Sequence, residues 1–116
     1  MKGSLFDHDL EISMHEGLCS GDEDEQDLEG ICFTTIKHGT VAIKLDSDIR
    51  GKGAANTLIH ELIHGVDHVS GLGLPHQVVY VLASGLTQAL TSLDLLDEHK
   101  LEAALRKRLK VQKKKT

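Results

Sequence analysis

Aromatic residues, proline and cysteine are scarce in this sequence. Aromatic side chains make up 3% of the 116 residues and tryptophan is absent, so Leu, Val, Ile and Ala must form the core. Phe6, Phe33 and Tyr80 are too few for a surface that stacks nucleobases. Cys19 and Cys32 are too few for a disulfide framework, and their spacing matches no cysteine-based zinc motif. We therefore expect a reducing, cytoplasmic setting.

Charge is absent from one long stretch and unevenly distributed elsewhere. Residues 68–93 contain no Asp, Glu, Lys or Arg, but their Gly, Ser, Thr, Gln and His make them too polar to cross a bilayer. The N-terminus lacks the apolar run of a secretory signal. Seven of the 13 basic residues lie in the last 11 positions, which contain no acid. We expect no membrane contact and a solvated basic tail for which nucleic acid is an unlikely partner.

The chain length fits one domain, over residues 1–112, followed by a basic and disordered tail over 113–116. Residues 21–27 hold five acids in seven positions and predict a solvated loop. Calcium binding is the alternative for this loop, although the EF-hand spacing and its closing Glu are missing. The oligomeric state cannot be predicted from these features.

Alternating and β-branched segments predict a small sheet. Leu10–Met14 has a weak period of two, and Ile31–Ile36 and Thr40–Leu45 flank a turn where Gly39 can supply a positive φ. Apolar periodicity and Gly or Pro boundaries predict helices over residues 54–69, 75–92 and 94–110. The fold class is therefore α+β, with a small antiparallel sheet packed on two or three helices.

His60-Glu61-Leu62-Ile63-His64 forms an H-E-x-x-H motif within the first of these helices. Helical residues four apart lie about 6 Å along the axis and about 40° around it, so both imidazoles can reach one metal ion. Zinc accepts nitrogen ligands and leaves a position for water at catalytic sites. Glu61 is then placed as general base toward a zinc-activated water that attacks a peptide carbonyl. With eight His and eight Glu in the chain, the motif would arise by chance only about 0.04 times.

A catalytic zinc site needs a third protein ligand, which the motif does not contain. His76 is the preferred candidate, because Gly71 and Gly73 allow a tight reversal that turns the next helix back toward the metal. The alternatives to His76 are Glu98, Asp67 and His68.

Each alternative ligand has a drawback. His68 is about 12 Å along the helix from His60, so it can bind the same ion only if the helix breaks after His64. Asp67 lies on the same helix and can instead orient a ligand histidine. Whether Glu98 can reach the metal depends on where the third helix begins.

The order of strand, polar loop, H-E-x-x-H helix and returning helix resembles the zincin metallopeptidases, most closely the short ImmA/IrrE-like and phage-type members. In the ImmA/IrrE-like kind the second helix carries a Glu zinc ligand followed by small and apolar residues. The corresponding residues here are His76, Val79, Leu82, Ala83 and Leu86. The match spans about residues 40–93. The resemblance implies a compact zincin-like domain that hydrolyses peptide bonds, with an edge strand, Thr40–Leu45, pairing with an extended substrate.

The leading functional hypothesis is a zinc metallopeptidase that acts on a protein or peptide substrate, with Glu61 catalytic. Its zinc ligands would be His60, His64 and His76. The alternatives are a non-catalytic zinc-containing module of the same fold that binds protein or DNA, and a helical interaction protein without metal. Glu61 favours catalysis, because a structural zinc site needs no general base. The remaining histidines have no ligand spacing and are expected at the surface, namely His8, His15, His38 and His99.

Overall fold

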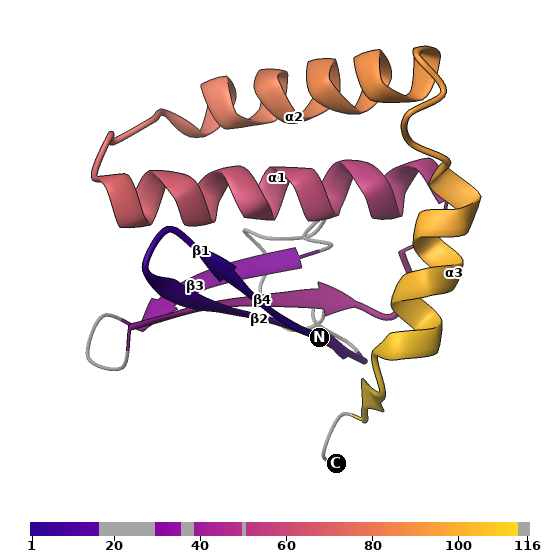
Figure 1. The fold of residues 1–116 in the computed structure, drawn as a ribbon, viewed down its shortest axis with the longest axis horizontal. Helices are drawn as coiled ribbons and strands as arrows, with labels where there is room; N and C mark the ends of the chain where they lie inside the picture. Colours follow the sequence, from indigo (N-terminus) through magenta and orange to yellow (C-terminus); the bar gives the residue numbers. More distant parts are fainter. Residues whose placement is uncertain (17–29, 36–38, 50, 114–116) are drawn as a thin grey trace, which may run out of the picture.

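The computed structural model describes residues 1–16, 30–35, 39–49 and 51–113. The elements form three layers (Figure 1), with a sheet at the bottom, helix α1 across one face of the sheet, and helix α2 on the far side of α1. Helix α3 stands at one end of these layers. The predicted α+β class is confirmed.

The sheet is mixed, whereas an antiparallel sheet was predicted. Its strand order is β1-β2-β4-β3, with β5 pairing with β2 as well. Pairs β1–β2 and β3–β4 are antiparallel, but β2 runs parallel to both β4 and β5. The strands are β1 (Lys2–Leu5), β2 (His8–His15), β3 (Gly30–Thr35), β4 (Thr40–Asp46) and β5 (Val111–Gln112).

Strand β4 lies inside the sheet, so its predicted position at an edge was wrong. It pairs with β2 on one side and β3 on the other, which leaves β3 as the edge strand on this side. Val41, Ile43 and Leu45 alternate toward α1 and have no solvent exposure. The turn before β4 contains Gly39 at φ +61°, as the hairpin pattern predicted.

The three helices were predicted in the right order, with shifted ends. Helix α1 spans Gly51–Ser70, and α2 spans His76–Ser92 with Pro75 as its N-cap residue at φ −61°. Helix α3 spans Glu98–Arg108, so it begins later than residue 94. The Asp97 side chain accepts a hydrogen bond from the Lys100 backbone N–H at 3.0 Å and caps α3.

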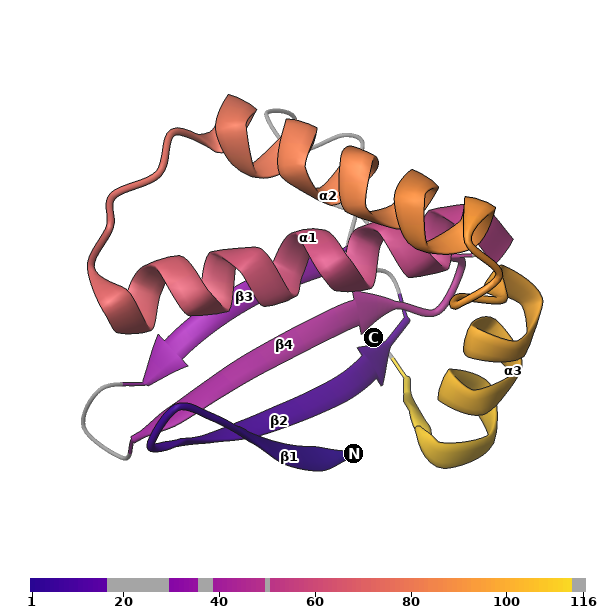
Figure 2. The same cartoon turned by 45° about the horizontal axis from the view of Figure 1, so that its top comes forward.

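The core lies between the sheet, α1 and α3, and its buried residues are Ile12, Met14, Ile43, Leu45, Ile49, Ala54, Leu58, Leu105 and Leu109. Arg106 fixes α3 to the connection between β4 and α1, because its guanidinium donates to the carbonyls of Ser47 (2.9 Å) and Ile49. Helix α2 packs chiefly on α1, through Val79, Ala83 and Thr87. Figure 2 shows α2 lying across α1, away from the sheet.

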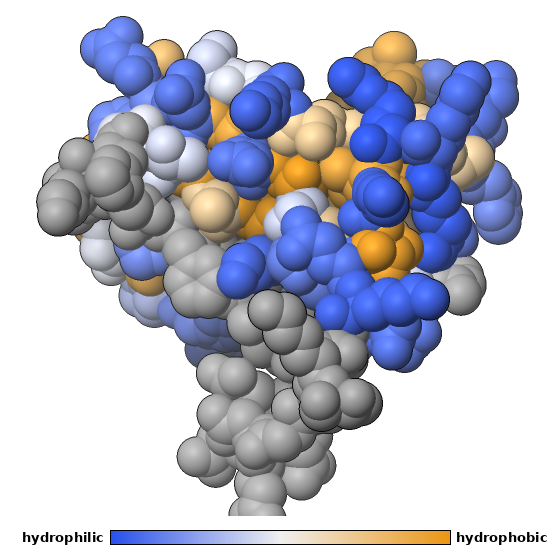
Figure 3. Space-filling model, turned by 90° about the horizontal axis from the view of Figure 1, so that it is seen from below, coloured by the Kyte–Doolittle hydropathy of each residue, from blue (hydrophilic) through white to orange (hydrophobic). Residues whose placement is uncertain are grey.

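Seen from below (Figure 3), the molecule shows hydrophilic residues around a central group of hydrophobic ones. None of the helices in the described part of the chain has the length and apolar character of a membrane span. The predicted acidic loop over residues 21–27, with its calcium alternative, lies outside the described residues, as do Cys19, His38 and the tail from residue 114.

Candidate metal centre

The H-E-x-x-H motif lies in the middle of α1, where two histidines are held one turn apart. The Nε2 atoms of His60 and His64 are 3.1 Å from each other, and the ring centroids are 4.7 Å apart. The separation of four residues places both rings on the side of α1 that faces α2. Two imidazoles this close share a proton as a hydrogen bond or direct two lone pairs at one cation.

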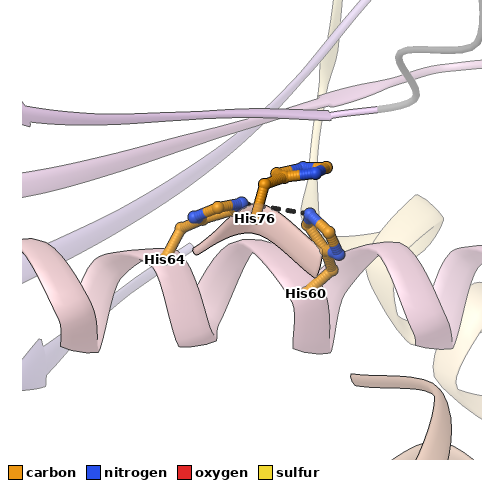
Figure 4. Close-up of side chains that lie close together, drawn as sticks. All are labelled: His60, His64 and His76. Atoms are coloured by element: carbon orange, nitrogen blue, oxygen red, sulfur yellow. Dashed lines mark hydrogen bonds between the residues drawn. The ribbon is translucent and has the colours of Figure 1, made fainter. Parts of the chain in front are cut away.

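His76 joins this pair from the first residue of α2. Its ring centroid lies 5.0 Å from that of His60 and 5.3 Å from that of His64. One ligand nitrogen from each of the three residues lies within 4.8 Å of the others, a group that could hold a metal ion. Figure 4 shows the three rings gathered together, two from α1 and one from α2. We call His60, His64 and His76 the histidine cluster.

The reversal between α1 and α2 carries His76 to this place. Gly71 and Gly73 have φ values of +71° and +70°, which a residue with a Cβ rarely adopts. The Gly71 backbone N–H donates to the Asp67 carbonyl at 2.8 Å and ends α1. The Asp67 carboxylate then accepts a hydrogen bond from the Leu74 N–H at 3.0 Å, two residues before His76. Both predicted glycines therefore form the reversal, and Asp67 closes it.

Burial and mutual repulsion lower the pKa of the two motif histidines, His60 and His64. Burial, followed by the neighbouring His64 and His76, lowers the pKa of His60 to about 4. Burial and the nearby His76 and His68 lower the pKa of His64, against an opposing effect of Asp67. Neutral imidazoles have the free lone pair that metal coordination requires.

Glu61 is the only buried acid on the described part of α1. It is 5% exposed and lies on the same stripe as Ala54 and Leu58, which packs toward the sheet. Burial raises the pKa of this carboxyl to about 7. Glu61 and His64 are three positions apart, so the buried carboxyl lies about 60° around α1 from that imidazole, on the side toward the sheet.

The other proposed ligands do not join the cluster. His68 is exposed, and its ring centroid is 6.5 Å from that of His64. Glu98 lies at the start of α3 and accepts a hydrogen bond from the Thr91 hydroxyl at 3.3 Å. Asp67 holds the reversal. Within residues 1–16, 30–35, 39–49 and 51–113, the histidine cluster is the one such group of His, Cys, Asp or Glu side chains.

Two of the histidines expected at the surface are only partly exposed. His8 and His15 are half-buried, and the His15 Nε2 lies 2.7 Å from the Ser13 hydroxyl. His99 is exposed as expected.

Tyr80 is a neighbour of the cluster that the motif did not indicate. Its ring centroid lies 6.2 Å from that of His60, and the side chain is 58% exposed. The signal in the sequence is its position four residues after His76, which places both on one side of α2. The phenol therefore borders the cluster on its solvent side.

Comparisons of the chain with protein-family models, with curated proteins and with solved structures found no match.

Proposed function

We propose that this protein is a zinc-dependent metallopeptidase whose zinc ligands are His60, His64 and His76. The observation that carries the proposal is the histidine cluster, because an H-E-x-x-H helix and a third histidine from another element converge on one point. Three imidazoles with a neighbouring carboxylate are a set of side chains typical of catalytic zinc. A protein or peptide is the proposed substrate.

Glu61 is the proposed general base. Bound zinc would act as a Lewis acid toward a water and a substrate carbonyl. Glu61 would take the proton of the attacking water and return it to the leaving amine. Its burial supports this role, because an enclosed carboxylate without compensating charge is costly and is retained mainly where it serves the chemistry.

Zinc content of the purified protein tests the site. We expect close to one zinc per chain in the wild type, and almost none after His60→Ala or His64→Ala, because two nitrogens do not complete a tight site. His76→Ala should reduce zinc affinity by about 100-fold or more, since it removes one of three ligands. The measurement is metal analysis after dialysis, followed by titration against a zinc indicator.

His68→Ala is the matched control for the zinc measurements. It removes an imidazole from the same helix, four residues after His64, without touching the cluster. The ligand assignment is wrong if this variant loses zinc while His76→Ala keeps it.

Glu61→Gln separates catalysis from metal binding. The amide keeps the size of the side chain but cannot accept the proton, so zinc content should persist while peptide cleavage falls by roughly 10²-fold or more. The measurement is digestion of a peptide library by the two zinc-loaded proteins. Equal cleavage by both would contradict the role of Glu61, and cleavage by neither would favour a metal-binding module without turnover.

A further inference from the structure

Helix α2 exposes an apolar surface on one side. Val78, Leu82, Gly85 and Ala89 follow one another at spacings of four, three and four residues, so they share a side of the helix. Val81 and Leu86 flank them, and Leu93 continues the same line past the helix end. We call these seven residues the α2 flank. It lies beside the stripe of Val79, Ala83 and Thr87 that packs on α1.

The α2 flank is separate from the histidine cluster. His76 and Tyr80 lie seven residues before Ala83 and Thr87, so they continue the buried stripe toward the start of α2 and face away from the flank. A partner seated on the flank would therefore leave the cluster accessible. Exposed polar side chains border the flank beyond Val81, namely Gln77 and Gln88.

The exposed area matches what an interface needs. Val81, Leu86 and Leu93 are 62%, 48% and 64% exposed, and Val78 and Leu82 are about as open as Leu86. These five side chains together expose on the order of 400 Å² of apolar surface, which is the size of the largest apolar patch on many monomeric proteins. A standard interface buries about 800 Å² per partner, of which a little over half is apolar.

The charge pattern favours a second copy of this chain over a charged partner. No Asp, Glu, Lys or Arg occurs in residues 68–93, so two α2 helices can approach without repulsion between like charges. A helix that exposes apolar residues beside its buried stripe and lacks charge is typical of a helix covered on both sides.

The order of large and small residues is self-complementary. If two α2 helices pack antiparallel about a two-fold axis between positions 85 and 86, Leu86 of one chain faces Gly85 of the other. Leu82 then faces Ala89, so the two leucines nearest the axis each meet a small residue, and Val78 faces Leu93 further out. A Cβ at Gly85 would meet no atom within 4 Å in the monomer, which leaves room there for the partner's Leu86.

We propose that the α2 flank is the interface of a symmetric homodimer, formed by antiparallel packing of two α2 helices. The inference does not depend on the proposed peptidase activity, because it uses no residue of the histidine cluster. Each chain keeps its own cluster, with the two clusters on outward sides of the α2 pair.

Sedimentation equilibrium of the full chain over a wide concentration range tests the dimer. We expect twice the 12.7 kDa chain mass for the wild type. Leu86→Glu should weaken the dimer by about 100-fold or more, because it places two carboxylates near the axis and removes apolar burial. The control is Gln77→Glu, which adds the same charge to α2 more than two turns from the proposed axis and should remain dimeric.

Circular dichroism and zinc content show whether Leu86→Glu is still folded. If it is not, Leu86→Ala offers a milder change that should also weaken the dimer. A wild type that stays monomeric at every concentration overturns the proposal. If such a monomer binds phosphatidylcholine vesicles through the α2 flank, the flank contacts lipid and not a second copy of the chain. A folded Leu86→Glu protein that dimerises as tightly as Gln77→Glu also overturns it.

Discussion

Asp67 controls the position of His76 without joining the histidine cluster. Its backbone carbonyl receives the Gly71 N–H at the end of α1, and its carboxylate receives the Leu74 N–H in the reversal. These bonds fix both ends of the short connection between the two motif histidines and His76. Asp67 is therefore a positioning residue for His76, the proposed third ligand.

Asp67→Ala should weaken zinc binding by roughly 10-fold, the effect usual for a residue that orients a ligand. The loss of the bond to Leu74 leaves His76 less restrained. Asp67→Asn should bind zinc nearly as well as the wild type, because the amide oxygen can still accept the Leu74 N–H. The measurement is zinc affinity by competition with a chelating indicator.

The Asn variant also distinguishes the hydrogen bond from the charge. The Asp67 carboxylate opposes the lowering of the His64 pKa, so its charge reaches the cluster as well. If Asp67→Asn binds zinc as weakly as Asp67→Ala, the charge is the important feature, and the positioning role is wrong.

Single residues of the site were predictable where their spacing was local. His60 and His64 come from one motif, and His76 follows from two glycines that reverse the chain. Asp67 was predicted only as a carboxylate that could orient a ligand histidine. Its bond to Leu74 and the place of Tyr80 were not predictable, because each depends on a distance across the reversal. Burial of Glu61 on the sheet side likewise depends on how α1 is rotated over the strands.

At the scale of elements, sequence patterns predicted the helices and the strands β2, β3 and β4, but not β1 and β5. Along β4, buried side chains alternate with partly exposed ones, as the sequence of this strand predicts. β1 is largely exposed, so no apolar alternation marks it, and β5 has only two residues. The parallel pairing of β2 with β4 joins segments far apart in sequence, which no local pattern encodes.

The capping side chains explain where the helices begin and end better than the periodicity of apolar residues does. α3 begins after Asp97, whose side chain caps it, although the apolar residues before it suggested an earlier start. Asp94 has a φ of +58°, and this turn separates α2 from α3. The separation matters for function, because Glu98 starts α3 at the end of α2 opposite His76.

At the scale of the whole molecule, the histidine cluster is a second contact between α1 and α2, in addition to the packing of their buried side chains. The sheet, α1 and α3 share the large core, whereas α2 adds mainly Val79, Ala83 and Thr87 against α1. A metal bound by two residues of α1 and one of α2 would tie the outer layer to the rest. Metal binding should therefore stabilise the fold and restrict the opening of α2.

Zinc at about 100 times its dissociation constant should raise the free energy of unfolding by about 2.7 kcal/mol and the midpoint of thermal unfolding by roughly 10 °C. The measurement is thermal unfolding with zinc or with a chelator, at one protein concentration so that dimerisation is held constant. At the same zinc concentration His76→Ala should show a much smaller shift, and His68→Ala the full shift. Amide hydrogen exchange locates the effect, since zinc should slow exchange in α2 more than in β4. A His76→Ala protein stabilised by zinc as much as the wild type would show that the metal does not join α2 to α1.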